Sequence, residues 1–364
     1  MRHLNPTLYE VIYDWFHQLP EDYDAKRGGN SRDNLNNSQE ALIACLVEQF
    51  PKSYREAYEV YRDLFNQIDI FSVYDDLEEI NVLALATGSG GDVFGFIHAC
   101  EAYLTGKRIN IFTVEGNKDA LRSQVNLFRQ YIEFNLVENE VNLIPIETVI
   151  EPGFIKLTSE LKRQCLKTYG IKKFDLIQSF KWMNEQSIRG KLTFYELYNW
   201  MNDWLLTNRM AVILENASPV SKYKCDQQVA MRALNDFAFF CKYQWRKNQL
   251  LALTPTPCIA RKLNGNKALQ CRGCTGCYDE IESYVKLINQ KTYSWQSDCV
   301  FVMKLATGEL GQKIASHLQN EKIGYQTATH IGEHPTRFCT LDCKVSANEQ
   351  ANAFLLTQKA HLKG

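Results

Sequence analysis

The stretch 82–96, VLALATGSGGDVFGF, constrains the fold more than any other part of this chain. An apolar run, Val82–Leu85, leads into a small-residue turn at 86–91 and then into apolar residues at helical spacing from Val93 to Leu104. A strand, a glycine turn and a helix in this order are typical of the nucleotide site in a doubly wound α/β sheet. The glycines let backbone approach a ligand closely, and the helix start offers unpaired N–H groups. An ordinary strand–turn–helix without a ligand is the plainer alternative.

The spacing of the glycines distinguishes two kinds of ligand. The dinucleotide fingerprint G-x-G-x-x-G fails here, because Val93 stands where its third glycine would be. S-adenosylmethionine (SAM) needs an open glycine turn but no pyrophosphate cradle. A second apolar segment, Ile109–Val114, is followed by Glu115, where a ribose hydroxyl pair would be held. Its carboxylate can accept two charge-assisted hydrogen bonds, each worth roughly 1.5–3 kcal/mol. The pattern therefore favours SAM.

In this stretch the chain resembles a class I SAM-dependent methyltransferase. That family usually has an acidic residue at the position of Ala84 and a glycine at the position of Ala86. The resemblance implies a cofactor site on the turn and on the ends of the next strands. Its expected residues are Thr87, Gly88, Ser89, Gly90, Glu115, Glu147, Gln178 and Ser179. No catalytic residue is assigned, because methyl transfer is an in-line displacement that positioning alone can accelerate strongly.

Strands and helices alternate regularly from Asn81 onward, which predicts an α/β fold with the Rossmann-like sheet of class I methyltransferases. Seven strands are expected, at 82–85, 109–114, 141–146, 174–178, 211–214, 250–253 and 299–305. Residues 1–75 form an expected helical region, 76–305 the methyltransferase-like domain, and 306–364 a small α+β extension. In the first region, Ser53-x-x-Glu56 is an expected capping box, and the tyrosines that follow it at three- and four-residue steps are expected core.

Four of the twelve cysteines form a cluster between the sixth and seventh expected strands, within 255–280. They are Cys258, Cys271, Cys274 and Cys277, spaced C-x12-C-x2-C-x2-C. Three thiols two residues apart suit three corners of a 4Fe–4S cluster, with Cys258 as the fourth ligand. Zinc is the alternative, although it more often takes two separated C-x2-C pairs. Free thiols on a glycine loop are the plainer alternative, and Cys100 and Cys165 elsewhere are expected to be buried thiols.

The residues around this cluster are basic, although the whole chain has a net charge of −1. Between Lys242 and Tyr278 there are seven lysines and arginines and no acidic residue. Such a concentration favours a phosphate-rich partner such as RNA, and the expected contacts are Arg261, Lys262, Lys267 and Arg272. Part of the excess can instead offset the negative charge of a thiolate-bound cluster.

With this cysteine loop, the chain loosely resembles the methyltransferase-like assembly factors of the small ribosomal subunit. The resemblance rests on Thr256-Pro257-Cys258 opening the loop, on the Ser-aromatic start of 179–185, and on Tyr293-Ser294-Trp295 before the seventh strand. It covers about 81–305 and lacks the Cys-Pro-His pattern and the tryptophan-cysteine-His ending of that family. It implies an iron–sulfur cluster and action on a ribosomal particle.

The expected function is therefore a SAM-dependent methyltransferase with a four-cysteine metal site, acting on RNA or a ribonucleoprotein. One alternative is a non-catalytic factor that binds SAM and metal. Another is a methyltransferase for a small molecule or a protein, with a structural metal. No apolar run is long enough to span a bilayer and the first residues lack a secretory core, so a cytoplasmic protein without membrane contact is expected.

Overall fold

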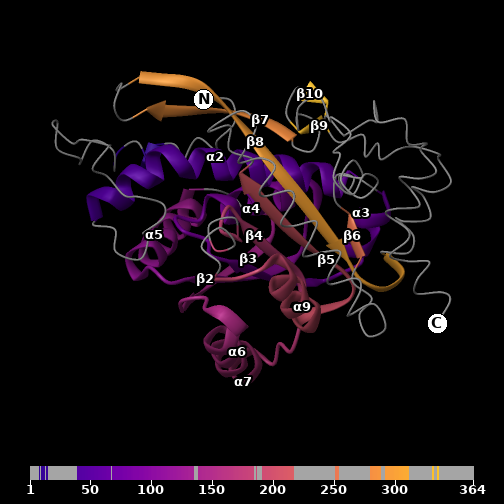
Figure 1. Cartoon of the computed structure of the whole chain (residues 1–364). Coiled ribbons are helices and arrows are strands. Elements are labelled where there is room, and N and C mark those ends of the chain that lie inside the picture. Colours follow the sequence, from indigo (N-terminus) through magenta and orange to yellow (C-terminus); the bar gives the residue numbers. More distant parts are fainter. Residues whose placement is uncertain are drawn as a thin grey trace, which may run out of the picture. The chain divides into compact units, whose positions relative to one another are not determined.

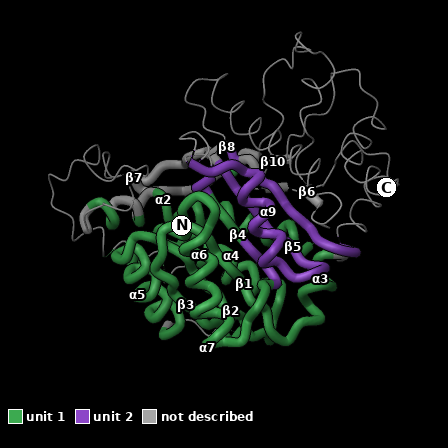
Figure 2. Tube along the Cα trace, turned by 60° about the horizontal axis from the view of Figure 1, so that its bottom comes forward, with its two compact units in different colours: residues 1–174, 178–180, 281–298 green, residues 175–177, 181–280, 299–364 purple. Residues whose placement is uncertain are grey.

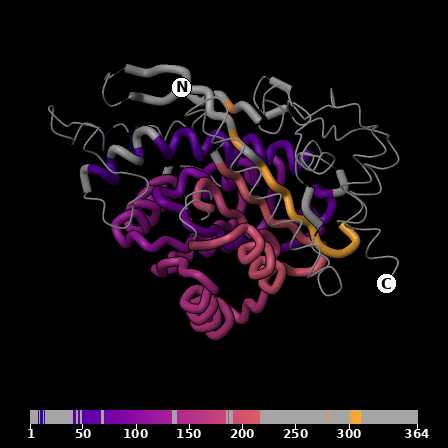
Figure 3. Tube along the Cα trace, viewed as in Figure 1, coloured from indigo at the N-terminus to yellow at the C-terminus, as the bar shows by residue number. Residues whose placement is uncertain are grey.

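The computed structural model describes the chain in segments, which Figure 1 shows in colour, and Figure 3 colours most of the same residues along the Cα trace. They are residues 8, 10–12, 14, 39–66, 68–134, 138–183, 186, 191–216, 251–253, 279–287, 292–310, 330–331 and 334–335. The four clustered cysteines and the four basic residues expected to contact RNA lie outside them. No helix among these segments is both long and apolar enough to cross a membrane.

Helices and strands alternate as expected between residues 79 and 216 (Figure 1). The helices are α2 (Gln39–Phe65), α3 (Ile68–Asp75), α4 (Gly91–Tyr103), α5 (Lys118–Phe134), 3-10 helix η2 (Pro152–Phe154), α6 (Ile155–Leu161), π-helix η3 (Lys162–Leu166), α7 (Lys167–Tyr169) and α9 (Phe194–Trp204). The strands are β1 (Glu79–Leu85), β2 (Arg108–Glu115), β3 (Glu140–Glu147), β4 (Phe174–Phe180), β5 (Leu205–Asn216), β6 (Leu251–Leu253), β7 (Asp279–Leu287), β8 (Thr292–Ala306), β9 (His330–Ile331) and β10 (His334–Pro335).

The chain divides into two compact units, which Figure 2 shows in green and purple. Unit 1 comprises 1–174, 178–180 and 281–298, and unit 2 comprises 175–177, 181–280 and 299–364. Strand β4 contributes residues to both units. The expected boundaries at 75 and 305 remain a prediction.

The sheet in unit 1 is parallel where its register is known. Its strand order is β3-β2-β1-β4, with Leu85 opposite Val114 and Glu115 opposite Glu147. Strand β1 is buried over most of its length and β4 over all of it, as expected for parallel strands covered on both faces.

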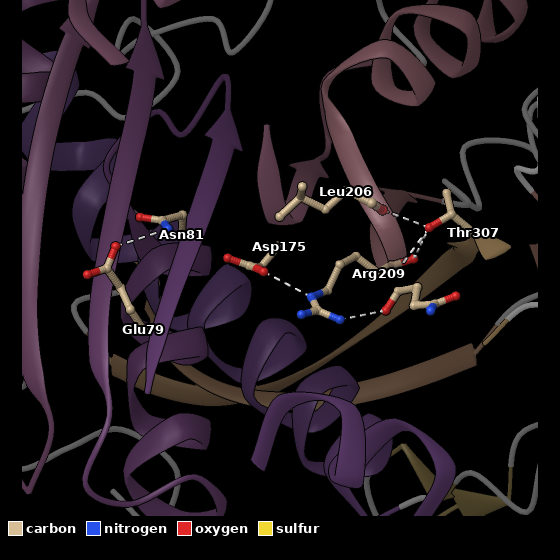
Figure 4. Close-up of polar contacts among 7 residues, drawn as sticks. Glu79, Asn81, Asp175, Leu206, Arg209 and Thr307 are labelled. Atoms are coloured by element: carbon tan, nitrogen blue, oxygen red, sulfur yellow. Dashed lines mark hydrogen bonds and ion pairs between the residues drawn. The ribbon is translucent and has the colours of Figure 1, made fainter. Parts of the chain in front are cut away.

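A ladder of asparagines stabilises the opposite ends of these parallel strands. Asn110 donates to Asn81 at 2.9 Å and Asn142 donates to Asn110 at 3.1 Å, and all three lie in register. Asn81 also donates to Glu79 at 3.2 Å (Figure 4). Side-chain pairs of this kind between neighbouring strands stabilise a sheet and fix its register.

In unit 2 the strand order is β4-β5-β8-β6, and β8 runs antiparallel to both β5 and β6. Arg209 on β5 donates from Nε to Asp175 on β4 at 2.9 Å (Figure 4). The backbone N–H of Arg209 also donates to Thr307 Oγ1 at 3.0 Å, and that hydroxyl donates to the Leu206 carbonyl at 2.8 Å. This network joins the start of β5 to the end of β8.

Every one of the seven expected strand segments overlaps a strand of the structure. Strand β7, which pairs with β8, was not predicted. The seventh expected strand is longer than predicted, because β8 begins at Thr292 rather than at 299.

The prediction that Ser53-x-x-Glu56 caps the start of a helix is wrong. Helix α2 begins at Gln39, so both residues lie in its interior. The tyrosine stripe, in contrast, is confirmed as core at Tyr54 and Tyr61, which are fully buried, whereas Tyr58 is half-buried. The buried state of the thiols is also confirmed for Cys100 and Cys165, and burial raises the pKa of Cys165 to about 12.

Helix α2 packs closely on α4 because α4 presents small residues to it. A Cβ added to Gly91 would lie 2.5 Å from the carbonyl oxygen of Phe50, and one added to Gly95 would overlap the carbonyl oxygen of Tyr54. These glycines are four residues apart and therefore share one face of α4. Their main role in the structure is this backbone approach between helices.

Candidate ligand site at the glycine turn

The turn after β1 is built from residues in the left-handed region. Ala86 has φ +53°, Gly88 +52° and Gly90 +87°. The turn is fixed to β2 because the N–H of Thr87 donates to the Val114 carbonyl at 3.2 Å. Gly90 is the N-cap of α4, so the turn runs directly into the first turn of that helix. The sequence predicted this strand–turn–helix arrangement.

One side of the turn is open and the other is occupied by a side chain. Among the described residues other than its chain neighbours, no atom lies within 4 Å of the position that a Cβ on Gly88 would take, whereas a Cβ on Gly90 would lie 2.8 Å from Cγ of Gln124. A ligand can therefore approach the backbone at Gly88, and the side at Gly90 belongs to the protein core.

Gln124, on α5, holds the conformation of the turn. Its Nε2 donates to Thr87 Oγ1 at 2.7 Å and to the Gly88 carbonyl oxygen at 2.6 Å. Because a carbonyl can only accept, the nitrogen of the amide must face it. The sequence analysis missed Gln124, although a signal was present: it is a polar residue three positions after Leu121 and four before Phe128 on the buried face of α5.

Glu115 lies directly beside the turn, at the end of β2. The Gly88 N–H donates to its Oε2 at 2.8 Å, and the Asn117 N–H donates to its Oε1 at 2.8 Å. Each carboxylate oxygen has a second lone pair, so Glu115 can still accept from a ligand hydroxyl. Glu115 is only 5% exposed, and this burial raises its pKa, although the backbone donors act in the opposite direction.

Glu147 and Ser89 are the more accessible of the expected cofactor residues. Glu147 is exposed at the end of β3, in register with Glu115, and Ser89 is half-buried in the turn. Together with Thr87, Gly88 and Gly90, these residues surround the carboxyl ends of β1, β2 and β3, where ligands bind in open α/β sheets.

At the end of β4, the two expected residues differ in their surroundings. Gln178 is fully buried, accepts from the Tyr61 hydroxyl at 2.8 Å and donates to Asp92 Oδ2 at 2.8 Å. Ser179 is also fully buried, but among the described residues its Oγ has no hydrogen-bond partner. A buried hydroxyl without a protein partner is expected to have another one, such as a water or a ligand.

In unit 2, the chain leaves β4 through a constrained turn. Lys181 has φ +59°, and its N–H donates to the Leu214 carbonyl at 2.6 Å. Glu215, buried at the end of β5, accepts from the N–H groups of Trp182 at 3.1 Å and Met183 at 2.6 Å. Strained backbone of this kind is held in place by its surroundings and is common near functional sites.

No cluster of three or more histidine, cysteine, aspartate or glutamate side chains suited to a metal ion occurs within the described segments. The expected ligands Cys258, Cys271, Cys274 and Cys277 lie outside those segments, so the metal site stays a prediction from the sequence.

Comparison with known proteins gives resemblances in structure only. No protein-family model matches the sequence, and no curated protein matches it. Similar solved structures include the plantazolicin methyltransferase BpumL in complex with SAH, with a TM-score of 0.40, 10% identity, and coverage of 83% of this chain and 99% of that one.

Two further structures are similar to a comparable degree. Fibrillarin from Aeropyrum pernix with natively bound SAM has a TM-score of 0.32 and 8% identity, and 68% of this chain and 76% of that one are covered. An arsenic(III) SAM methyltransferase from Chlamydomonas reinhardtii has a TM-score of 0.32 and 12% identity, with 82% and 73% covered. These structural neighbours are SAM-dependent methyltransferases, but at such TM-scores the function of this chain must be argued from its own residues.

Proposed function

We propose that this chain is a methyltransferase that binds SAM at the turn 86–91 and transfers its methyl group to an acceptor. The observation that carries the proposal is the open backbone at Gly88 beside the buried carboxylate of Glu115, which lie 2.8 Å apart between N and Oε2. The two groups offer an adenosyl ligand a place for close backbone approach and an acceptor for its ribose hydroxyls.

The residues of the turn and the strand ends fit such a ligand. Glu115 would accept from the ribose, Glu147 would lie near the adenine, and Ser179 would supply a buried hydroxyl at the end of β4. When bound, SAM supplies an activated methyl group on its sulfonium. The protein's contribution to catalysis would be orientation and the exclusion of water, which in well-aligned systems is worth up to about 7–11 kcal/mol. No catalytic acid or base is assigned.

Calorimetric titration tests the binding step. We expect wild-type protein to bind SAM and S-adenosylhomocysteine, and the Glu115→Gln variant to bind about tenfold more weakly, which corresponds to about 1.4 kcal/mol. NAD is the matched competitor, because the glycine spacing argues against a pyrophosphate cradle. Binding of NAD in preference to SAM would contradict the proposal.

The acceptor we propose is RNA or a ribonucleoprotein, supported by the basic sequence between 242 and 278. Release of S-adenosylhomocysteine during incubation with RNA tests this acceptor. Binding of SAM without turnover would favour the alternative of a non-catalytic factor. Turnover with a protein or a small molecule, together with no RNA binding, would favour the third alternative.

We also propose that Cys258, Cys271, Cys274 and Cys277 hold a 4Fe–4S cluster, with zinc as the alternative. The support is their spacing in the sequence. A brown anaerobic preparation whose iron and visible absorption are lost in a Cys274→Ser variant is the expected result. A colourless, zinc-containing protein would identify the alternative.

A further inference from the structure

The segment 151–173, between β3 and β4, concentrates positive charge on the surface of unit 1. It contains six basic side chains against two acidic ones, in a chain whose total net charge is −1. All six basic residues are exposed: Lys156, Lys162, Arg163, Lys167, Lys172 and Lys173. Figure 1 shows α6 and α7 as one coiled segment that carries the first four of them.

Two of these cations are already paired within the segment. Lys156 lies 2.5 Å from Glu151, and Arg163 lies 2.6 Å from Glu160. Within the described part of the chain, no ion pair involves the four others, Lys162, Lys167, Lys172 and Lys173. Four exposed charges of one sign therefore share a short stretch without local neutralisation.

The backbone brings these charges together. Residues 162–166 form a π-helix, whose i→i+5 hydrogen bonds make its turn wider than that of an α-helix. Lys162 and Lys167 are five residues apart in the sequence, the separation that one such turn spans. Such π-turns occur frequently at functional sites. Like charges at this separation repel each other, and an anion bound between them would remove that repulsion.

The helix then ends so that the last two lysines follow at once. Gly170 has φ +72°, its N–H donates to the Leu166 carbonyl at 3.1 Å, and the Ile171 N–H donates to the Cys165 carbonyl at 3.0 Å. The first of these bonds, from C′ to C3, is that of the αL motif, after which the chain continues through Lys172 and Lys173 into β4.

An exposed aromatic residue lies between these lysines in the sequence. Tyr169 is 50% exposed, and its ring packs edge-on against Phe112 with 5.4 Å between the centroids, so it is supported from one side and accessible from the other. A supported aromatic ring next to unpaired lysines is the combination by which proteins bind single-stranded nucleic acid: the cations contact phosphates and the ring stacks on a base.

We infer that Lys162, Lys167, Tyr169, Lys172 and Lys173 form a docking surface for single-stranded RNA. This inference rests on the proposed RNA acceptor and gives it a second contact region, separate in sequence from the cysteine loop. A membrane partner is less well supported, because the exposed apolar residues Ile155 and Leu166 are scattered, whereas surface-bound helices need a continuous apolar face.

Fluorescence anisotropy with a labelled oligouridylate of about 16 nucleotides, the upper end of a single-module site, tests the inference over a series of salt concentrations. The variant Lys162→Ala/Lys167→Ala should bind about tenfold more weakly at low salt, and its salt slope should fall by about 1.4, because each lost single-strand phosphate contact removes about 0.7. The matched control is Lys118→Ala/Arg129→Ala, which removes the same charge from exposed positions on α5 and should bind like wild type.

The aromatic contribution is tested separately. Tyr169→Ala should weaken binding by about fivefold or more with an unchanged salt slope, since stacking is not an ionic contact, while Tyr169→Phe should bind like wild type. Equal losses in the two double variants, no loss in either, no RNA binding by wild type, or binding to anionic vesicles in place of RNA would each overturn the inference. Because RNA binding is measured without SAM, a failure here is distinct from a failure to bind SAM.

Discussion

Ala86 is held at φ +53°, a conformation that costs an L-residue about 1–2 kcal/mol and glycine almost nothing. It stands where the methyltransferase family usually has glycine, and the structure supplies a physical reason for that preference. Replacing Ala86 with glycine removes the strain. It also stabilises the unfolded state by about 0.5–1 kcal/mol, because glycine gives the unfolded chain more conformational entropy. We expect Ala86→Gly to raise the free energy of unfolding by up to about 1 kcal/mol, measured by urea denaturation followed by circular dichroism.

Ala84→Gly is the matched control for that substitution. Ala84 is buried in β1, where glycine relieves no strain, so this variant should lose about 1–2 kcal/mol. Equal destabilisation by the two variants would show that the left-handed conformation at Ala86 stores no strain.

Glu115 gives the expected SAM site a definite pH dependence. Burial raises its pKa, so the folded protein takes up this proton more readily than the unfolded chain, and the stability linked to this group is lost as pH rises through the folded pKa. Ribose binding has the opposite requirement, because the ionised carboxylate is the better acceptor. SAM affinity measured by calorimetry should therefore fall as pH decreases through the raised pKa.

Two variants distinguish the contribution of Glu115 to this pH dependence from that of Glu147. Glu115→Gln should bind SAM weakly at every pH, while Glu147→Gln, at the exposed position opposite, should keep the wild-type pH profile. A flat profile for wild type would show that Glu115 does not contact the ligand in its ionised form.

Sequence patterns could identify the residues of the turn but not the side chains that hold it. The glycines and Glu115 are close in space because β1 and β2 are parallel neighbours, which their apolar runs predict. Gln124 was missed because a single polar residue on an apolar helix face indicates that a partner exists without saying which one. Asp92 and Tyr61 were missed for the same reason, since they meet through Gln178 across long sequence separations.

At the scale of the elements, the packing of α2 on α4 depends strongly on single residues. Gly95 leaves room for the backbone of α2, and an added Cβ would overlap the Tyr54 carbonyl and lie 2.9 Å from Cβ of Ala57. Gly95→Ala should therefore lower the free energy of unfolding by about 3 kcal/mol, the upper end of the usual cost of overpacking. Gly170→Ala is the contrast, because it meets no atom within 4 Å and should cost only the left-handed strain of about 1–2 kcal/mol.

The hydrogen bond from Tyr61 to Gln178 ties α2 to the end of β4 and can be measured by a double-mutant cycle. Tyr61→Phe leaves the buried Oε1 of Gln178 without this donor, which should cost about 1–3 kcal/mol. Combined with Gln178→Met, the two substitutions should show a coupling free energy of about 1 kcal/mol in urea denaturation. Additive losses would mean that the bond contributes nothing beyond packing.

Element positions were predictable where the apolar pattern was long, as in β1, β2 and α9. Helix α9 is buried at Phe194, Leu197, Tyr198 and Met201, whose spacing in the sequence is typical of one face of a helix. The start of α2 was not predictable from the capping box, because Ser53 and Glu56 lie in a helix that continues through Pro51. Strand β7 was missed because charged residues interrupt the apolar positions of its sequence, DEIESYVKL.

At the scale of the whole molecule, the division into two units means that the stability of each unit should be measured with its own substitution and its own probe. The ion pair between Asp175 and Arg209 lies within unit 2, and their side chains are only 6% and 16% exposed. Removing one partner leaves a largely buried charge, so Asp175→Ala should cost about 3 kcal/mol. Tryptophan fluorescence can follow this loss in a background in which Trp15 and Trp295, the two tryptophans of unit 1, are replaced by phenylalanine, because Trp200 and Trp204 lie on α9 in unit 2.

The comparison with Gly95→Ala then reports on cooperativity between the units. If the chain unfolds in one transition, both variants shift the same midpoint whether fluorescence or circular dichroism is recorded. If the units unfold separately, Asp175→Ala should shift the fluorescence midpoint and Gly95→Ala should leave it unchanged.

Gly91 closes the turn 86–91, and a Cβ at this position would lie 2.5 Å from the carbonyl oxygen of Phe50 on α2. An engineer who wishes to change what the turn accepts therefore cannot enlarge position 91 without displacing a 27-residue helix. Gly90 is blocked in the same way by Gln124. Position 89, with its half-buried serine, is left as the place where new cofactor preferences can be selected.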